Sequence, residues 1–180
     1  RSVYQSHLRG PKIDWKAMEA GFLTFIGEEP EKKEPYEIRD GVAVVSIEGV
    51  LTKGLSFFSF LFGGRSMREI GDAIRQASED SAVSSILLYI DSPGGTVDGT
   101  QELASIVFAA RSAKPIIAFS DGEICSAAYW IGSAAGRVFI SGDTVAVGSI
   151  GVVATHIDQS KFDEQMGDKY TEIVAGKYKR

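Results

Sequence analysis

Residues 83–95 read VSSILLYIDSPGG, a short apolar run that ends in a polar turn. The run is largely apolar and is ended by turn residues, which predicts a buried strand over Val83–Ile90. Asp91-Ser92-Pro93-Gly94-Gly95 follows directly, and its two glycines allow a sharp turn with no Cβ to shield their N–H groups. Such N–H groups can hold an oxyanion or an extended peptide, although Pro-Gly-Gly is also common in plain strand-to-helix turns.

Strands and helices alternate on both sides of this stretch, from Gly41 onward. Ser66 and Glu69 have the spacing of a capping box, which predicts the start of a helix. Strands separated by helices predict an α/β fold with parallel strands joined by crossover connections. The other expected strands are Val42–Ile47, Pro115–Phe119, Arg137–Ile140, Gly151–Thr155 and Tyr170–Val174, and further helices are expected after the 91–95 turn, over Ser126–Ala135 and near Lys161–Met166.

The first 40 residues differ in pattern from this region. Apolar residues recur at helical spacing over residues 15–26, and residues 28–35 combine two prolines with charged residues. The second composition builds no packed core and indicates a linker. We therefore expect residues 1–40 to be an N-terminal arm and charged linker, and residues 41–180 to form one domain. A loosely ordered terminus is the alternative for the arm.

Composition excludes several classes of protein. The chain has 180 residues and a formal net charge of −5, so it lacks the excess of positive charge that is typical of nucleic-acid-binding proteins. Its single cysteine, Cys125, lacks a disulfide partner and the companions of a zinc site, and we expect neither a metal nor another cofactor. No apolar run reaches the ~18–20 residues that span a bilayer, so no integral membrane segment is expected in this chain. The start at Arg1 leaves room for a targeting segment upstream.

A second segment with residues capable of catalysis is 122–130, GEICSAAYW. Ser126 stands where a helix opens after a strand, which places its hydroxyl near the positive end of the helix. The N–H group of Ala127, the next residue, is then available to an oxyanion. The alternative is that Ser126 only caps the helix. Cys125 is intrinsically the better nucleophile, but its place beside Ile124 predicts a side chain that points into the core.

A serine nucleophile needs a base that takes its proton. His7 lies in the arm, and His156 follows the expected strand over residues 151–155. A lysine can replace histidine where burial lowers its pKa enough to leave it neutral. The tail contains Lys177 and Lys179, but clusters of basic residues are usually solvated surface. The residues alone therefore leave the choice of base open.

Together, these segments resemble the signal peptide peptidase A family of serine peptidases, a family that includes phage and prophage head-maturation proteases. The likeness runs over residues 41–180 and rests on four stretches in the family's order. They are Asp91–Gly95 for the oxyanion-side motif, Ser126–Tyr129 for the Ser-Gly-Gly-Tyr-like nucleophile segment, Val147–Val152 for the Gly-Ser-Ile/Leu-Gly-Val segment, and Gly176–Lys179 for the stretch with the catalytic lysine.

The resemblance implies a Clp protease/crotonase-like fold, an α/β spiral of ββα units with mostly parallel strands. It implies that residues 41–180 form the catalytic domain of a serine endopeptidase in which Ser126 attacks the scissile carbonyl and Lys179 is the general base. The N–H groups of Ala127 and of Gly94 or Gly95 are then expected to hold the oxyanion. Alanines replace the family's glycines after Ser126, which narrows the space near the nucleophile.

The resemblance also implies partners. We expect a peptide or protein substrate, either signal-peptide remnants or phage capsid and scaffold proteins, and a ring-shaped homo-oligomer whose active sites combine residues of neighbouring subunits. A phage-type role favours the cytoplasm, and membrane association is expected if an upstream segment exists. The aromatic run Leu55–Phe62 lies between glycines and is predicted to be a subunit contact or an apolar wall of the substrate groove, with ordinary core as the alternative.

Three other functions fit parts of the sequence. A Clp-like Ser-His-Asp peptidase would use His156, with Asp158 two residues further on. A crotonase-like acyl-CoA enzyme would share the scaffold and the oxyanion hole but needs an acyl-CoA pocket. A catalytically silent assembly scaffold would need neither base nor nucleophile. A serine-directed covalent probe separates the peptidase from the last two.

Overall fold

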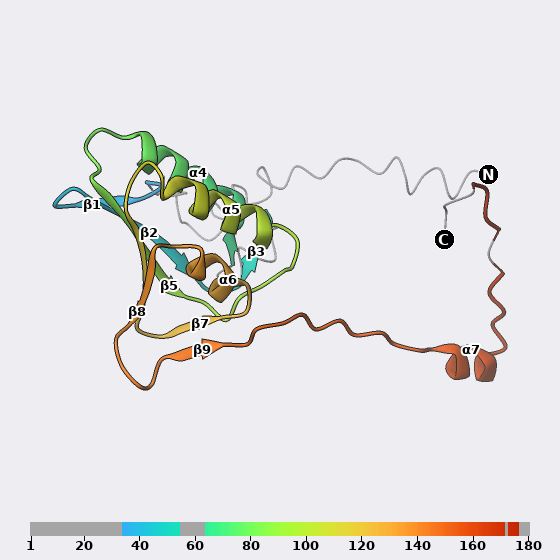
Figure 1. Ribbon diagram of the computed structural model, residues 1–180. Coiled ribbons are helices and arrows are strands. Elements are labelled where there is room, and N and C mark those ends of the chain that lie inside the picture. Colours follow the sequence, from blue (N-terminus) through green and yellow to red (C-terminus); the bar gives the residue numbers. More distant parts are fainter. Residues whose placement is uncertain (1–33, 55–63, 172, 177–180) are drawn as a thin grey trace, which may run out of the picture.

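The computed structural model describes residues 34–54, 64–171 and 173–176 (Figure 1). The N-terminal arm up to residue 33, the aromatic run Leu55–Phe62 and Lys179 lie outside the described residues.

A five-stranded sheet lies at the centre, with strand order β1-β2-β5-β6-β8. Four of its strands are parallel, and β1 pairs antiparallel with β2 at one edge. The four parallel strands confirm four of the expected strands, with bounds that differ by at most a few residues. The sheet strands are β1 (Glu37–Arg39), β2 (Val42–Glu48), β5 (Ser85–Asp91), β6 (Ile116–Ser120) and β8 (Arg137–Ile140).

Short strands and helices follow the sheet strands in turn. They are β3 (Leu51–Thr52), β4 (Arg65–Ser66), α4 (Met67–Glu79), α5 (Thr100–Ala110), β7 (Glu123–Cys125), α6 (Ala127–Ser133), β9 (Ala146–Gly148) and α7 (Ser160–Met166). Among the described residues, β3 and β4 follow β2 before α4, and one short strand follows each of β6 and β8 before the next helix. After β5 the chain forms the 91–95 turn before α5. The expected α/β fold with mostly parallel strands is confirmed.

The 91–95 turn joins the two small sheets that these short strands form. β3 pairs with β4, and β7 pairs with β9, both in parallel. Single β-bridges connect Leu51 to Gly95 and Ser92 to Ile124, so the turn lies between β3 and β7. This second layer of short strands brings the start of α6 next to the turn.

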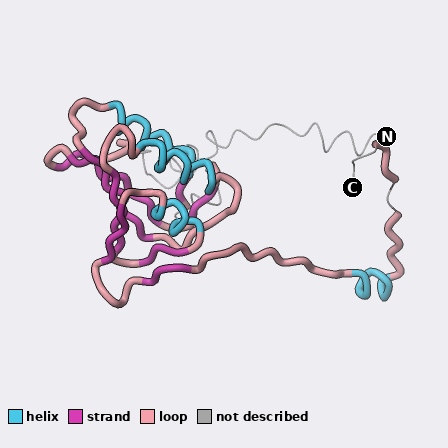
Figure 2. The backbone as a smooth tube through the Cα atoms, viewed as in Figure 1, coloured by secondary structure: helices cyan, strands magenta, loops and turns pink. Residues whose placement is uncertain are grey.

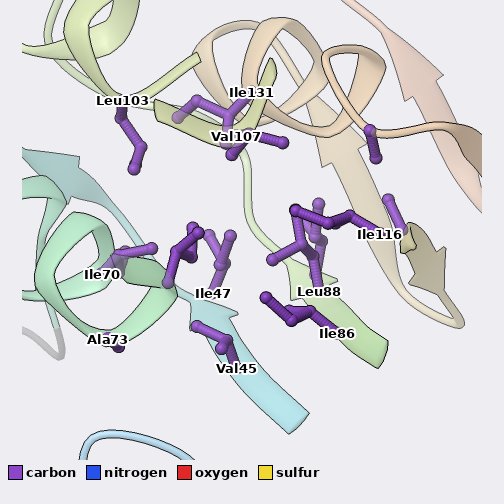
Figure 3. Packing of buried hydrophobic residues seen from close by; sticks show 14 of the residues in the cluster. Val45, Ile47, Ile70, Ala73, Ile86, Leu88, Leu103, Val107, Ile116 and Ile131 are labelled. Atoms are coloured by element: carbon purple, nitrogen blue, oxygen red, sulfur yellow. The ribbon is translucent and has the colours of Figure 1, made fainter. Parts of the chain in front are cut away.

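The core lies between one face of the sheet and the helices α4, α5 and α6 (Figure 3). Side chains alternate between buried and half-buried along β2 and β5, because successive strand residues point to opposite faces. Ile47 and Leu88 from the sheet and Ile74 from α4 are fully buried. Ser66 caps α4 by accepting a hydrogen bond from the Glu69 N–H group at 3.3 Å, which confirms the predicted helix start.

The chain after β9 departs from expectation. Strands were expected over Gly151–Thr155 and Tyr170–Val174, but the described residues of both ranges form no strand, and these predictions are wrong. Apart from α7, the described part of this segment runs away from the sheet with no described strand beside it (Figure 2), and β pairing requires such a partner. α7 confirms the helix expected near Lys161–Met166, and none of its residues is buried. Among the helices that the structure describes, none has the length and apolar character needed to cross a membrane.

Candidate active site

Ser126 lies where β7 ends and α6 begins. Its backbone has φ +51° and ψ −121°, outside the regions that residues with a side chain favour. The residue stands at the N-cap position of α6, but its side chain makes no capping hydrogen bond. An ordinary N-cap serine has extended backbone angles and caps through its hydroxyl. Strained residues of this kind gather at functional sites, so the geometry favours a nucleophile over a cap.

Backbone hydrogen bonds on both sides hold Ser126 in this conformation. Its N–H group donates to the Gly148 carbonyl at 2.8 Å, and its carbonyl accepts from the Trp130 N–H group at 3.0 Å. Ile124 is fully buried, whereas Cys125 is only half-buried, with its Sγ atom 3.6 Å from the Ala146 carbonyl oxygen. The expectation that Cys125 points into the core is therefore wrong, because the alternation along β7 turns Ile124 inward instead.

The 91–95 turn packs directly against Ser126. A Cβ placed on Gly94 would lie 2.7 Å from the Ser126 Cβ atom, and Gly94 has φ +99°. Glycine is therefore required there both for space and for backbone conformation. Gly95 lies even closer to the Leu51 backbone, where a Cβ would be 1.8 Å from the carbonyl oxygen. The structure thus brings Gly94, Gly95, Ser126 and Ala127 together.

The N–H groups around Ser126 differ in what they bond. The Gly94 N–H group donates to the Ser92 Oγ atom at 3.1 Å. The N–H groups of Gly95 and Ala127 donate to no other residue in the part of the chain that the structure describes. Two uncommitted backbone donors beside a serine are the chemical requirement for an oxyanion hole.

A cavity of about 350 Å³ opens next to the serine. Gly95, Ser126 and Ala127 all line it, so the two uncommitted N–H groups belong to residues on its wall. Its other walls are mostly apolar and come from the loop before α5, the first residue of α5, helix α6 and the segment after β9. They are formed by Thr96, Val97, Thr100, Tyr129, Trp130, Ser133, Ile150, Gly151 and Val152.

The alternative base His156 does not line this cavity. It lies exposed on the chain between β9 and α7. Asp158 accepts a hydrogen bond from the Ser160 N–H group at 2.9 Å, and hydrogen bonds from Ser160 lower the pKa of Asp158. The Asp158 carboxylate is therefore hydrogen-bonded to the first residue of α7. Lys179 and His7 lie outside the described residues.

Two residues of the Asp91–Gly95 motif take part in the site although the sequence assigned them no role. The Asp91 carboxylate accepts a hydrogen bond from the Glu123 N–H group at 3.0 Å and fixes the start of β7. Ser92 is fully buried and bonds to Gly94. Ile150 and Val152 contribute to the cavity wall, and their place in the Val147–Val152 stretch was the available signal.

Known proteins match both the chain and its fold. Residues 109–180 match the model of peptidase family S49. Capsid assembly protease C of Escherichia phage lambda is 33% identical over 153 residues, which are 83% of this chain and 34% of that protein. Protease 4 of Haemophilus influenzae is 30% identical over 151 residues, which are 82% of this chain and 23% of that protein.

A solved structure shows the same fold at low identity. A mutant of the 1510-N membrane-bound stomatin-specific protease superposes with a TM-score of 0.51 and 15% identity, over 72% of this chain and 60% of that one. The strained serine and the neighbouring N–H groups are arranged as a serine peptidase requires, and the chain spans 34% and 23% of the length of the two curated relatives above. Residues 109–180 match peptidase family S49, and the similarity to these proteases confirms the resemblance to signal peptide peptidase A.

Proposed function

We propose that the protein is a serine endopeptidase that works through a Ser126–Lys179 dyad without a metal or other cofactor. The observation that carries this proposal is the strained Ser126 backbone beside Gly94 and Gly95, at the wall of an apolar cavity. We assign Lys179 as the base because it matches the stretch that carries the family's catalytic lysine.

The proposed reaction is acyl transfer in two steps. The Ser126 Oγ atom attacks the scissile carbonyl carbon while the neutral Lys179 amine takes the hydroxyl proton. The N–H groups of Gly95 and Ala127 hold the oxyanion that forms, and the lysine passes its proton to the leaving amine. A water molecule, deprotonated by the same lysine, then attacks the ester carbonyl. The lysine returns this proton to the Ser126 oxygen as the ester bond breaks, which releases the peptide acid and restores the serine.

The cavity supports a preference for substrates with an apolar side chain next to the cleaved bond. Val97, Trp130 and Ile150 give it apolar walls, and an apolar pocket accepts an apolar side chain without leaving buried polar groups unpaired. We propose a phage-type role on capsid or scaffold proteins in the cytoplasm, because one similar protein is named a capsid assembly protease. Cleavage of signal-peptide remnants is the alternative, and Protease 4 is similar as well.

We also propose that the active form is a ring-shaped homo-oligomer with shared active sites. The segment after β9 exposes large apolar side chains, with Val153 at 94% and Ile173 at 95% exposure. Exposed apolar surface of this kind marks interaction sites. A neighbouring subunit that covers this segment would also receive the stretch that leads to Lys179.

Covalent labelling with a fluorophosphonate, read by mass spectrometry on the full-length protein, tests the nucleophile. Stoichiometric labelling at Ser126 that is lost in Ser126→Ala is the expected result. If the wild type is oligomeric but takes up no label, the proposed peptidase function is wrong. An acyl-CoA enzyme or a catalytically silent scaffold would then be the remaining functions.

Three matched variants test the base. Lys179→Ala is expected to abolish turnover, whereas Lys177→Ala and His156→Ala keep it. Activity should rise with pH as Lys179 loses its proton, because only the neutral amine accepts the serine proton. Loss of turnover in His156→Ala with activity kept in Lys179→Ala would replace the dyad by a Ser-His arrangement.

Mixing two inactive variants tests whether sites are shared. Ser126→Ala and Lys179→Ala subunits each lack one catalytic group, so neither is active alone. If serine and lysine come from neighbouring subunits, random mixing restores about a quarter of the sites. A mixed oligomer with no activity would place both residues in one subunit.

A further inference from the structure

Ser92 joins the 91–95 turn to three other parts of the site. Its N–H group donates to the Glu123 carbonyl at 2.8 Å, and its carbonyl accepts from the Cys125 N–H group at 3.1 Å. Its hydroxyl donates to the Gly49 carbonyl at 2.6 Å and accepts from the Gly94 N–H group at 3.1 Å. The residue is fully buried, and every polar group that it carries is bonded.

The hydroxyl determines which amide of the turn faces the cavity. The Gly94 N–H group is held inward by Ser92, so it has no free hydrogen for an oxyanion. The Gly95 N–H group bonds to no described residue, and Gly95 lines the cavity with Ser126. Of the two glycines, Gly95 is thus the donor that the geometry leaves available.

The same bond controls the distance between the turn and the nucleophile. A Cβ on Gly94 would lie 2.7 Å from the Ser126 Cβ atom and 2.9 Å from the Ala127 nitrogen, so the Gly94 backbone touches both. Gly94 has φ +99°, a conformation that a glycine leaves easily unless its N–H group is held. A rotation of this peptide would move the Gly95 N–H group and press on Ser126.

We propose that Ser92 is a positioning residue of the oxyanion hole, whose hydroxyl binds the Gly94 N–H group and thereby aims the Gly95 N–H group at the reacting carbonyl. This inference rests on the proposed peptidase function. It assigns Ser92 no contact with the substrate.

Ser92→Ala tests the proposal, with Ser120→Ala as a matched control. Ser120 is also a fully buried serine at the end of a sheet strand, but its Oγ atom has no hydrogen-bond partner among the described residues. We expect kcat per fluorophosphonate-labelled Ser126 to fall about 10- to 100-fold in Ser92→Ala with KM nearly unchanged, because a misplaced donor fails only in the transition state. Ser120→Ala should keep the wild-type kcat.

A purely structural role would give a different result. Ser92→Ala would then lower the melting temperature while kcat per labelled site stayed within about twofold of wild type, and this outcome overturns the proposal. If the alanine variant does not fold, Ser92→Cys keeps a side chain of similar size with a much weaker hydrogen bond and should show the same loss of kcat.

Amide hydrogen exchange separates this proposal from the proposed function. The Gly94 amide should exchange slowly in the wild type and much faster in Ser92→Ala, whether or not the protein is a peptidase. Equal protection in both proteins overturns the positioning role. A wild type that takes up no label at Ser126 overturns both the proposed function and the catalytic part of this proposal, while faster exchange would still establish the hydrogen bond.

Discussion

Gly94 and Ser126 pack against each other. Each has a positive φ angle, a conformation that glycine adopts more easily than residues with a side chain. Gly94 has φ +99° and Ser126 has φ +51°. Only the first of them is glycine, so the strain at the site falls on the serine. Strain of this kind persists only where the surrounding structure holds it, here through the Gly148 and Trp130 hydrogen bonds.

Gly94→Ala should damage the site more than the fold. The new Cβ would lie 2.7 Å from the Ser126 Cβ atom, so the turn or the serine must move. We expect hydrolysis to fall about 100-fold or more and the free energy of unfolding to fall by about 1–3 kcal/mol.

A peptidase assay and urea unfolding measure these two effects. Gly54→Ala is the matched control, because a Cβ there would meet nothing within 4 Å, and it should keep both activity and stability. Wild-type hydrolysis in Gly94→Ala would show that the turn and the nucleophile do not depend on each other.

Among the elements, α4 shows most directly how local sequence signals act within the fold. Its first turn is capped by Ser66, and its buried face contains Ile70 and Ile74. The cap satisfies the Glu69 N–H group, one of the donors that a helix start leaves without a partner.

Ser66→Ala should lower the free energy of unfolding by about 1 kcal/mol, because the capping hydrogen bond is lost. Ser105→Ala in α5 removes an exposed hydroxyl that bonds back to the Gln101 carbonyl, and it should change stability by less than about 0.5 kcal/mol. Urea unfolding of the three proteins measures the difference. Equal stability of the two variants would mean that Ser66 contributes nothing as a cap.

Across the whole molecule, the body (the sheet with helices α4, α5 and α6) and the segment after β9 differ in how far their apolar side chains are buried. The body buries them between sheet and helices (Figure 3). The later segment exposes Val153, Ile157 and Ile173, and α7 on it has no buried residue. An apolar segment without its own core needs another surface to cover it.

Val153→Asp should therefore weaken assembly. A charge at a contact side chain that becomes buried between subunits costs binding free energy, and we expect the dissociation concentration to rise at least about tenfold. Sedimentation over a concentration series measures this change. Lys169→Asp, an exposed change on the same segment, is the control. An unchanged dissociation concentration in Val153→Asp would exclude this part of the segment from the subunit contact.

The sequence by itself determined the features that depend on neighbouring residues. Strands β2, β5, β6 and β8 follow from short, largely apolar runs, and the start of α4 follows from a serine and a glutamate three residues apart. The candidate nucleophile and the two glycines also came from contiguous motifs. Local patterns suffice there because burial on one face and capping are settled within a few residues.

Only the tertiary structure decided the features that join distant segments. β7 and β9 are three residues each, too short to show a period, and they exist through pairing with each other. Tertiary contacts also turned Ile124 rather than Cys125 inward, committed the Gly94 amide to Ser92 and strained Ser126. The strands expected after β9 failed for the same physical reason, since a β-strand forms only where another strand supplies its hydrogen bonds.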